Sequence, residues 1–278
     1  MKYYGFKSVA KFPRSNNKRL GFAVGSIAQA ITQLFANNEQ GFAFDFNDLS
    51  TMYQDAAGTI PVTGVGQPVG KVLDKSGRGN HATQSTSAKR PILQKNATTG
   101  AYYLAFDGVD DGLVINSIDF SNTNSVTIFG GVVFNNLSIN SQFIVELSND
   151  SWANKGTFAL FRGYGNIADY ALRRNITSGS PEDLTANNDN TSTAVVTGVI
   201  DSNKNTEFLR NLGKLKISKT LEVTTNKFKT YPLTIGSRQN TLPLSGAIYS
   251  LMVIGRATTD LETVNTEKVI AKNVGVTL

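Results

Sequence analysis

The chain consists of short apolar segments that alternate with turns rich in Gly, Asn, Asp and Ser. It holds 25 Gly among 278 residues, and frequent turns between short apolar runs are typical of β-strands in a sandwich or barrel. A single all-β sandwich can exceed about 200 residues, so we expect one domain to take up most of the chain. Cysteine is absent. Neither disulfides nor thiolate zinc sites are therefore available, and stability must come from a hydrophobic core.

Four motifs follow one another along the chain. They are Leu73-Asp-Lys-Ser-Gly-Arg-Gly-Asn-His-Ala82, Tyr103-Leu-Ala-Phe-Asp-Gly-Val-Asp-Asp-Gly-Leu-Val-Ile115, Leu233-Thr-Ile-Gly-Ser237 and Ser245-Gly-Ala-Ile-Tyr-Ser-Leu-Met-Val-Ile254. In the first motif we expect Asp74 to accept backbone N–H groups across the loop, while its glycines take positive φ. In the second motif two strands flank residues 107–112, whose Asp-Gly pairs predict a hairpin turn.

The order and spacing of these motifs resemble the laminin-G-like, concanavalin-A-like jelly roll of lectin-type modules and of many bacteriophage virion proteins. The resemblance implies an all-β fold: a two-sheet antiparallel jelly-roll sandwich with an N-terminal helix and a short C-terminal helix. Residues 44–59 and the motif at Leu73 also resemble a segment common in predicted phage tail and structural proteins. One departure is Leu212, which separates Asn211 from Gly213 where the family has an Asn-Gly turn, so we expect a bulged or longer hairpin there.

Apolar periodicity predicts further elements. Strands are expected at residues 41–46, 125–134, 142–147, 156–161 and 193–200. Near the end of the chain, Thr259 and Glu262 form a capping box. The helix that follows has Leu261, Val264 and Ala271 as its predicted apolar side, and we expect it to pack over the edge or base of the sandwich.

Positive charge is concentrated at the N-terminus. Residues 1–19 hold six basic residues and no acidic one, which equals the net charge of +6 for the whole chain. A helical pattern follows over residues 20–37, with apolar residues at three- and four-residue steps. Three interpretations are open: the helix packs on its own sandwich, it docks or self-associates, or the region is a signal peptide.

We expect residues 1–40 to form a basic tail and amphipathic helix for virion attachment or oligomerisation, and residues 41–278 to form the sandwich. The predicted docking residues are Lys2, Lys7, Lys11, Arg14, Val24, Ile27, Ile31 and Leu34. No run approaches the ~18 apolar residues of a membrane span, so we expect a soluble protein. Nucleic-acid binding by the sandwich is not supported, because the rest of the chain has no net charge.

The residues that could carry catalysis are few. His81 is the only histidine and lies in a Gly-rich turn, so we predict a structural role for it. Glycoside hydrolases on this fold resemble one another in a Glu-x-Asp-x-x-Glu strand, which has no counterpart here. Glu146 and Asp150 form a single pair of acids. We therefore predict no catalytic residues and no enzyme activity.

Two groups of residues suggest ligands. Asp107, Asp110 and Asp111 cluster in one turn and are candidate Ca²⁺ ligands, although such acids are also ordinary turn chemistry; no other metal or cofactor is expected. The stretch 152–190 combines aromatic and arginine side chains with a long polar loop at 175–190, and such groups bind sugars on rigid sandwiches. The candidate glycan-binding residues are Trp152, Arg162, Tyr164, Tyr170, Arg173 and Arg174. The alternative is that these aromatics are buried anchors and the arginines are solvated.

Taken with the resemblance, these features predict a non-enzymatic phage virion protein. It would be a tail-associated fibre or adhesin, held by other virion proteins through residues 1–40, whose sandwich binds a host surface glycan. The tail is favoured over the capsid surface as its location. The helical stripe favours a homo-oligomer, with a trimer expected. The alternatives are a capsid decoration or cement protein with the same sandwich, and a secreted carbohydrate-binding module.

Overall fold

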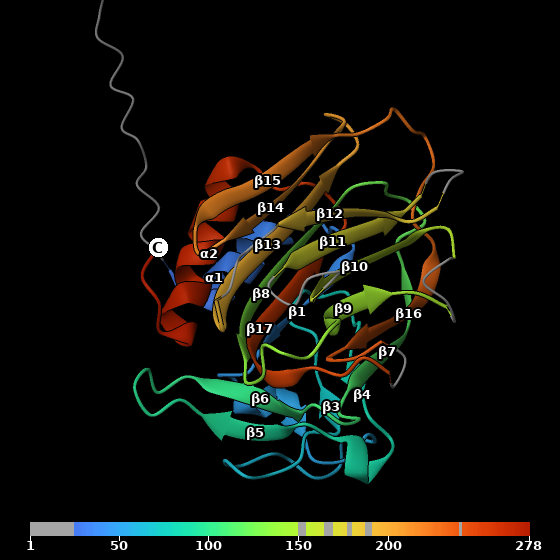
Figure 1. The fold of residues 1–278 in the computed structure, drawn as a ribbon. Helices are drawn as coiled ribbons and strands as arrows, with labels where there is room; N and C mark the ends of the chain where they lie inside the picture. The colour runs from blue at the N-terminus through green and yellow to red at the C-terminus, as the bar shows by residue number, and fades with distance from the viewer. Residues whose placement is uncertain (1–24, 150–153, 164–168, 177–179, 187–190, 239–240) are drawn as a thin grey trace, which may run out of the picture.

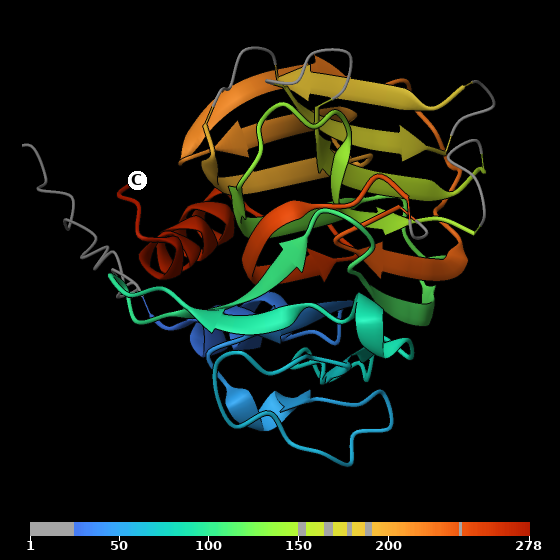
Figure 2. The same cartoon turned by 60° about the horizontal axis from the view of Figure 1, so that its bottom comes forward.

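The computed structural model describes residues 25–278 apart from 150–153, 164–168, 177–179, 187–190 and 239–240. In the described part of the chain two antiparallel sheets pack face to face, and two helices lie against the outer side of one of them (Figures 1 and 2). The predicted two-sheet sandwich with an N-terminal and a C-terminal helix is confirmed.

Sheet A has the strand order β15-β14-β13-β8-β17-β6-β5, and β1 also pairs with β17. Its strands are β1 (Gly41–Asp45), β5 (Ile92–Lys95), β6 (Tyr102–Asp107), β8 (Val126–Phe134), β13 (Thr193–Asp201), β14 (Thr206–Asn211), β15 (Lys214–Thr220) and β17 (Ser245–Ile254). The long strands β8 and β17 pair along most of their length at the centre of the sheet.

Sheet B has the strand order β12-β11-β10-β9-β16-β7-β4-β3-β2. Its strands are β2 (Met52–Tyr53), β3 (Lys71–Val72), β4 (Ala82–Thr83), β7 (Leu113–Asp119), β9 (Gln142–Leu147), β10 (Thr157–Arg162), β11 (Tyr170–Asn175), β12 (Glu182–Ala186) and β16 (Thr230–Ile235). Short 3₁₀ turns η1 (Leu49–Thr51) and η2 (Ser87–Lys89) complete the connections. The expectation of a polar loop over residues 175–190 is wrong where β12 lies, because β12 pairs in register with β11.

The main core lies between the two sheets. Alternate side chains of each strand point inward and interdigitate, as expected for stacked sheets. Fully buried members from both sheets include Phe44, Leu104, Ile144, Phe158 and Leu233. Burial of this apolar surface is the main stabilising contribution to a chain without disulfides.

The second motif does not form a hairpin. Its two strands belong to different sheets, because β6 pairs with β5 and β17 while β7 pairs with β16 and β4. Residues 108–112 therefore carry the chain from sheet A to sheet B. The Asp-Gly pairs indicated a turn correctly, but turn chemistry does not determine which strands become partners.

The β14–β15 hairpin combines a tight turn with a bulge. Leu212 and Gly213 both have positive φ, 49° and 73°, as a two-residue type I′ turn requires. The register shifts between Leu209 and Arg210. The expected bulge is thus present, and Asn211 pairs with Lys214 without a longer loop.

The first motif folds as predicted around one carboxylate. Oδ1 of Asp74 accepts hydrogen bonds from the backbone N–H of Ala43 and Ser76 at 2.9 and 2.8 Å, and Oδ2 accepts one from Asn80 at 3.0 Å. Gly77 and Gly79 take φ of 83° and 75°. The backbone N–H of Asp74 donates to Nδ1 of His81 at 3.0 Å. His81 therefore has a structural partner in this loop.

Helix α1 (Ile27–Leu34) starts with a capping box formed by Ser26 and Gln29. Its residues Ile27, Ile31 and Leu34 are buried in an apolar cluster with α2 and the outer face of sheet A. Packing of the helix on its own sandwich was one of the three open interpretations, and these side chains are covered in that way. Docking of residues 1–40 to another protein stays a prediction. The other predicted docking residues, Lys2, Lys7, Lys11, Arg14 and Val24, lie outside the described residues.

Helix α2 (Asp260–Val274) begins at the predicted capping box of Thr259 and Glu262. It packs across β8, β13 and β17 on the outer face of sheet A, not over an edge or base. Ile270 and Val274 face the sheet, whereas Leu261, predicted to be on the apolar side, is 56% exposed. Neither α1 nor α2 has the length and apolarity that a membrane-crossing helix needs.

Candidate functional site

The outer face of sheet B carries a small aromatic cluster that is separate from the main core. Phe143 on β9, Ala159 and Phe161 on β10, and Ala171 on β11 form it. These residues alternate with inward-facing neighbours such as Ile144 and Leu160, which belong to the core. Because α1 and α2 both pack on sheet A, the two outer faces of the sandwich differ in what lies against them.

Four planar side chains form a continuous stack on this face. The rings of Phe143 and Phe161 are cross-strand partners and lie parallel, with centroids 4.5 Å apart and an interplanar angle of 5°. The guanidinium of Arg238 lies 4.1 Å from the centroid of Phe143. That of Arg173 lies 5.1 Å from the centroid of Phe161. We call Arg238, Phe143, Phe161 and Arg173 the arginine–phenylalanine stack.

Each arginine of the stack is held by an acidic residue. Arg238 donates to Glu146 through Nη2 at 2.7 Å and Nε at 3.0 Å. Arg173 donates to Asp183 through Nε at 2.7 Å and Nη2 at 2.8 Å. Such two-point pairs fix the plane of the guanidinium as well as its charge. The side chain of Glu146 is only 3% exposed, so removing Arg238 would leave a buried, unpaired carboxylate.

The third motif positions Arg238. Gly236 has φ of 77°, and a Cβ there would lie 2.2 Å from the ring of Phe106, so only glycine fits between β16 and the core. Two residues later, Arg238 and Thr241 exchange backbone hydrogen bonds of 2.7 and 2.6 Å. This local bridge holds the arginine beside β9. Sequence reasoning did not select Arg238, Phe143 or Glu146 together, although Phe143 and Glu146 lie on a predicted strand.

Two polar atoms on this face have no hydrogen-bond partner among the described residues. Nη1 of Arg238 makes no hydrogen bond to any residue that the structure describes. Thr234 of β16 pairs in register with Glu146, and its Oγ1 is buried without a hydrogen-bond partner there. A guanidinium edge and a hydroxyl beside aromatic rings are groups that bind sugar hydroxyls.

The predicted glycan-binding residues are dispersed by the fold. Arg173 is part of the stack. Arg162, Tyr170 and Arg174 point between the sheets and are at most 1% exposed. Arg174 there joins Glu207 of sheet A to Glu182 of β12 through bonds of 3.1 and 2.9 Å. Trp152 and Tyr164 lie outside the described residues.

The carboxylates of Asp107 and Asp111 accept hydrogen bonds from backbone N–H groups of their own turn. Asp107 Oδ1 accepts the backbone N–H of Val109 and Asp110, and Asp111 Oδ2 accepts that of Asp107. The three carboxylates lie within 4.8 Å of one another, and burial, with the nearby charges of Asp107 and Asp110, raises the pKa of Asp111 to about 6. The oxygens could be gathered around a hard cation, and Ca²⁺ binding stays a prediction.

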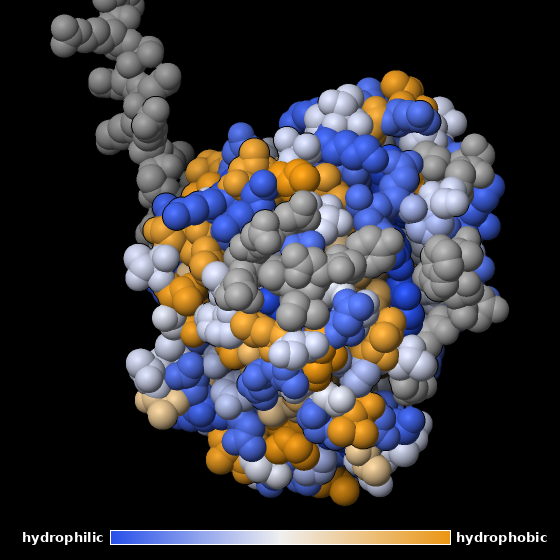
Figure 3. Space-filling model, in the orientation of Figure 1, coloured by the Kyte–Doolittle hydropathy of each residue, from blue (hydrophilic) through white to orange (hydrophobic). Residues whose placement is uncertain are grey.

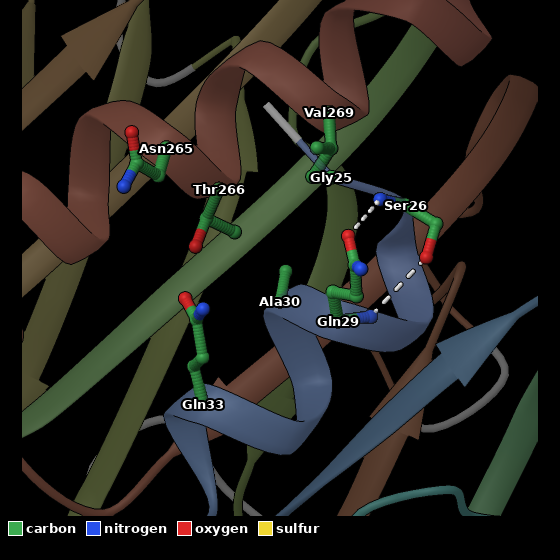
Figure 4. Close-up of a pocket in the computed structure, with 8 residues that line it drawn as sticks. All are labelled: Gly25, Ser26, Gln29, Ala30, Gln33, Asn265, Thr266 and Val269. Carbon is green, nitrogen blue, oxygen red and sulfur yellow. Dashed lines mark hydrogen bonds between the residues drawn. The ribbon is translucent and has the colours of Figure 1, made fainter. Parts of the chain in front are cut away.

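The cavities on the helical side of the described chain include the following two. Figure 4 shows the first, between α1 and α2, where Gln33 and Thr266 approach and the Ser26–Gln29 capping bonds close one end; its volume of about 30 Å³ suits a water molecule rather than a sugar. The second is a groove of about 280 Å³ between α2 and the β14–β15 hairpin. Phe208, Leu215 and Val264 give it an apolar lining. Figure 3 shows apolar side chains gathered near α2 and β15.

Comparison with solved structures supports the fold. The chain matches botulinum neurotoxin type C, which depends on interaction with two ganglioside molecules to enter cells, with a TM-score of 0.57 and 8% identity over 86% of this chain and 53% of that chain. It matches the binding domain of botulinum neurotoxin DC, solved with rat synaptotagmin II, with a TM-score of 0.56 and 10% identity over 84% and 52%. The chain thus spans about half the length of these neurotoxin chains.

A further match is the CBM40 module of a Ruminococcus gnavus sialidase bound to α2,3-sialyllactose, with a TM-score of 0.43 and 17% identity over 51% of this chain and 81% of that chain. No protein-family model and no curated protein sequence matches the chain. The neurotoxin matches share the lectin-like β-sandwich of this chain, and at such low identity they support the fold alone.

Proposed function

We propose that this protein is a non-catalytic, lectin-like module that binds glycan on the outer face of sheet B. The observation that carries the proposal is the arginine–phenylalanine stack, with its free guanidinium edge on Arg238 and the buried hydroxyl of Thr234. The opposite outer face is occupied by α1 and α2. The dependence of type C neurotoxin cell entry on two ganglioside molecules supports glycan as the class of ligand, without indicating a face.

The mode of contact follows from burial. The two rings are buried, whereas the side chain of Arg238 is 16% exposed. We therefore expect sugar hydroxyls to accept hydrogen bonds from Arg238, with the rings supporting the guanidinium from below rather than stacking on the sugar. Binding of this kind is polar and shallow, so an affinity in the range of about 10 µM to 1 mM is expected for a single site.

The acids of this face are arranged for positioning rather than for hydrolysis. Both oxygens of Glu146 accept from Arg238, and Asp183 accepts from Arg173 through both of its own. A glycosidase needs one acid free to donate a proton and a second free to attack or activate water. Glu146 and Asp183 are instead each committed to an arginine.

A glycan array probed with the full-length chain tests the proposal. The double variant Arg238→Met/Glu146→Leu removes the arginine without leaving Glu146 unpaired, so it should fold yet lose at least about tenfold in affinity for any glycan bound by the wild type. Leu261→Ser, on the exposed side of α2, is the matched control and should bind normally. Equal binding by the double variant and the wild type would reject this face as the site.

Attachment to a phage particle is a second candidate role, with the tail favoured over the capsid. The concentration of +6 charge in residues 1–19 and the phage-like segments of the sequence favour it, and it is compatible with glycan binding. Cryo-electron microscopy of particles from the encoding genome tests it: density for the sandwich on the tail supports the role, and density on the shell supports decoration. Recovery only as free, N-terminally processed protein supports the secreted module. Light scattering of the full-length chain tests the expected trimer.

A further inference from the structure

Arg162 is a buried arginine that has no acidic partner among the residues that the structure describes. It ends β10, and its side chain points between the sheets with 0% exposure. Nη1 donates to the carbonyl of Leu137 at 3.5 Å, the limit of a hydrogen bond. Nε and Nη2 are buried and have no hydrogen-bond partner. A buried guanidinium in this state is costly, because a charge removed from water needs compensation.

Five other arginines on the sandwich use those same two atoms to hold carboxylates. In Arg173, Arg210 and Arg238, Nε and Nη2 both bind a single carboxylate, at 2.7 to 3.0 Å. In Arg174 and Arg256 the two atoms bind two different glutamates, at 2.7 to 3.1 Å. Arg162 presents the same fork, and no ion pair joins it to an acid among the residues that the structure describes.

Neighbouring side chains fix the plane of this fork. The guanidinium carbon lies 5.4 Å from the ring centroid of Phe134 and 5.8 Å from that of Tyr170. The two rings meet edge to face, 6.0 Å apart, and Tyr170 is anchored by its hydroxyl to the carbonyl of Thr191 at 3.3 Å. An arginine packed against two rings presents its Nε–Nη2 edge in one orientation, which favours a planar, two-oxygen ligand group.

We infer that Arg162 binds the carboxylate of a ligand at the end of the sandwich, between β8, β10 and β11. The choice of an acidic sugar as that ligand rests on the proposed glycan binding, whereas the carboxylate itself does not. Because Arg162 is enclosed, the ligand reaches it only when the β8–β9 connection at Leu137 moves outward. The bond of 3.5 Å to Leu137 is the described hydrogen bond that this movement breaks.

Calorimetric titration of the full-length chain at constant ionic strength tests the inference, with glucuronate, acetate, glucose and sulfate as probes. We expect saturable binding of glucuronate. The binding should fall at least tenfold in Arg162→Met and in Arg162→Lys, since lysine keeps the charge but loses the fork. Arg90→Met is the matched control, because Nε and Nη2 of Arg90 bind backbone carbonyls, and it should bind glucuronate as the wild type does.

Comparing the probes separates failure of carboxylate binding at Arg162 from failure of sugar recognition. Acetate bound as tightly as glucuronate supports the carboxylate site and counts against recognition of the sugar. Sulfate bound as tightly as both, unchanged binding in Arg162→Met, or no binding of any carboxylate overturns the inference. The Arg162 Nε–H resonance of the wild-type chain, followed by NMR during the glucuronate titration, keeps the test valid if a variant fails to fold: a saturable shift supports direct contact, and no shift overturns it.

Discussion

The two outer faces of the sandwich differ in the kind of side-chain contact that they carry. The outer face of sheet A is covered by α1 and α2, and the contact is apolar, with Phe129, Met252 and Ile270 at its centre. The outer face of sheet B carries the arginine–phenylalanine stack, in which each cation is paired with an acid. The outer face of sheet A is covered by helices from both ends of the described chain. The outer face of sheet B carries guanidinium groups that ion pairs hold in a defined orientation.

The difference shows what each face can do. Helices that cover a sheet remove water and require only shape and apolarity, so that face contributes stability. Ion pairs on the other face contribute little net stability, because the cost of desolvation offsets their attraction. They do hold guanidinium groups in a defined geometry. We therefore assign stability mainly to the helix-covered face and recognition to the arginine–phenylalanine stack.

The largest effect should come from placing a charge under α2. Ile270 is fully buried against sheet A, so Ile270→Asp would bury an unpaired carboxylate and cost more than about 4 kcal/mol, enough to unfold many domains. Urea denaturation followed by circular dichroism measures it. Lys268→Asp, on the exposed side of the same helix, should change the free energy of unfolding by less than about 0.5 kcal/mol. Similar results for both variants would mean that α2 does not stabilise the sandwich.

In the arginine–phenylalanine stack, a single substitution should lower the free energy of unfolding more than a double substitution does. Arg238→Met leaves Glu146 buried and unpaired and should cost about 3–5 kcal/mol, whereas Arg238→Met/Glu146→Leu should return to within about 1 kcal/mol of the wild type. A double-mutant cycle in urea measures both. A cost of less than about 1 kcal/mol for the single variant would mean that Glu146 is in contact with water, which would contradict its burial on this face.

A smaller change tests how closely α2 approaches sheet A. A Cβ at Gly131 would lie 2.6 Å from Cγ2 of Ile270 and 2.9 Å from Cγ2 of Val274. Gly131→Ala should therefore displace the helix and cost about 1–3 kcal/mol. Gly64→Ala is the control, because a Cβ there meets no atom within 4 Å. A stabilising Gly131→Ala would indicate that the helix packs less tightly than described.

The smallest effect concerns Arg256, which links α1, α2 and Glu39 through ion pairs and a hydrogen bond. Arg256 donates to Glu262 of α2, to Glu39 and to the carbonyl of Leu34 in α1. Burial alone would raise the pKa of Glu39 and Glu262, but hydrogen bonds from backbone N–H groups and from Arg256 lower both pKa values below the usual 4.5.

A lowered carboxylate pKa stabilises the fold above its unfolded-state value, and this contribution is lost as the pH falls through the folded-state pKa. Arg256→Met should therefore cost about 1–2 kcal/mol at pH 7 and less at about pH 3. Free energies of unfolding at the two pH values measure the difference. The same cost at both pH values would mean that Arg256 stabilises the fold through packing alone.

Much of the fold could be predicted from local signals. Apolar periodicity located β9 at its observed bounds, the fourth motif has the same bounds as β17, and the capping box located the start of α2. Asp74 was identified as a loop acceptor because Asx side chains at the ends of Gly-containing turns accept backbone N–H groups. Such features depend on neighbours within a few residues, which the sequence displays directly.

The misses have a common physical origin in long-range pairing. Glu182 and Asp183 were predicted to lie in a polar loop, but they belong to β12, where they form ion pairs with Arg174 and Arg173 of β11. Arg238 and its partner Glu146 are 92 residues apart. The partners of β6 and β7 lie in different sheets, which no turn motif encodes. The stack was therefore missed as a unit, although Phe143 and Phe161 lie on predicted strands and Arg173 was a predicted glycan-binding residue.

Hydrogen-exchange mass spectrometry with and without a glycan selected by the array is the most direct test of the central claim, that the outer face of sheet B is the binding face. We predict slower exchange in peptides that cover residues 142–147, 157–162 and 170–175, with no change in those that cover α1 and α2. Slower exchange in the helices, with β9, β10 and β11 unaffected, would contradict the account and move recognition to the opposite face.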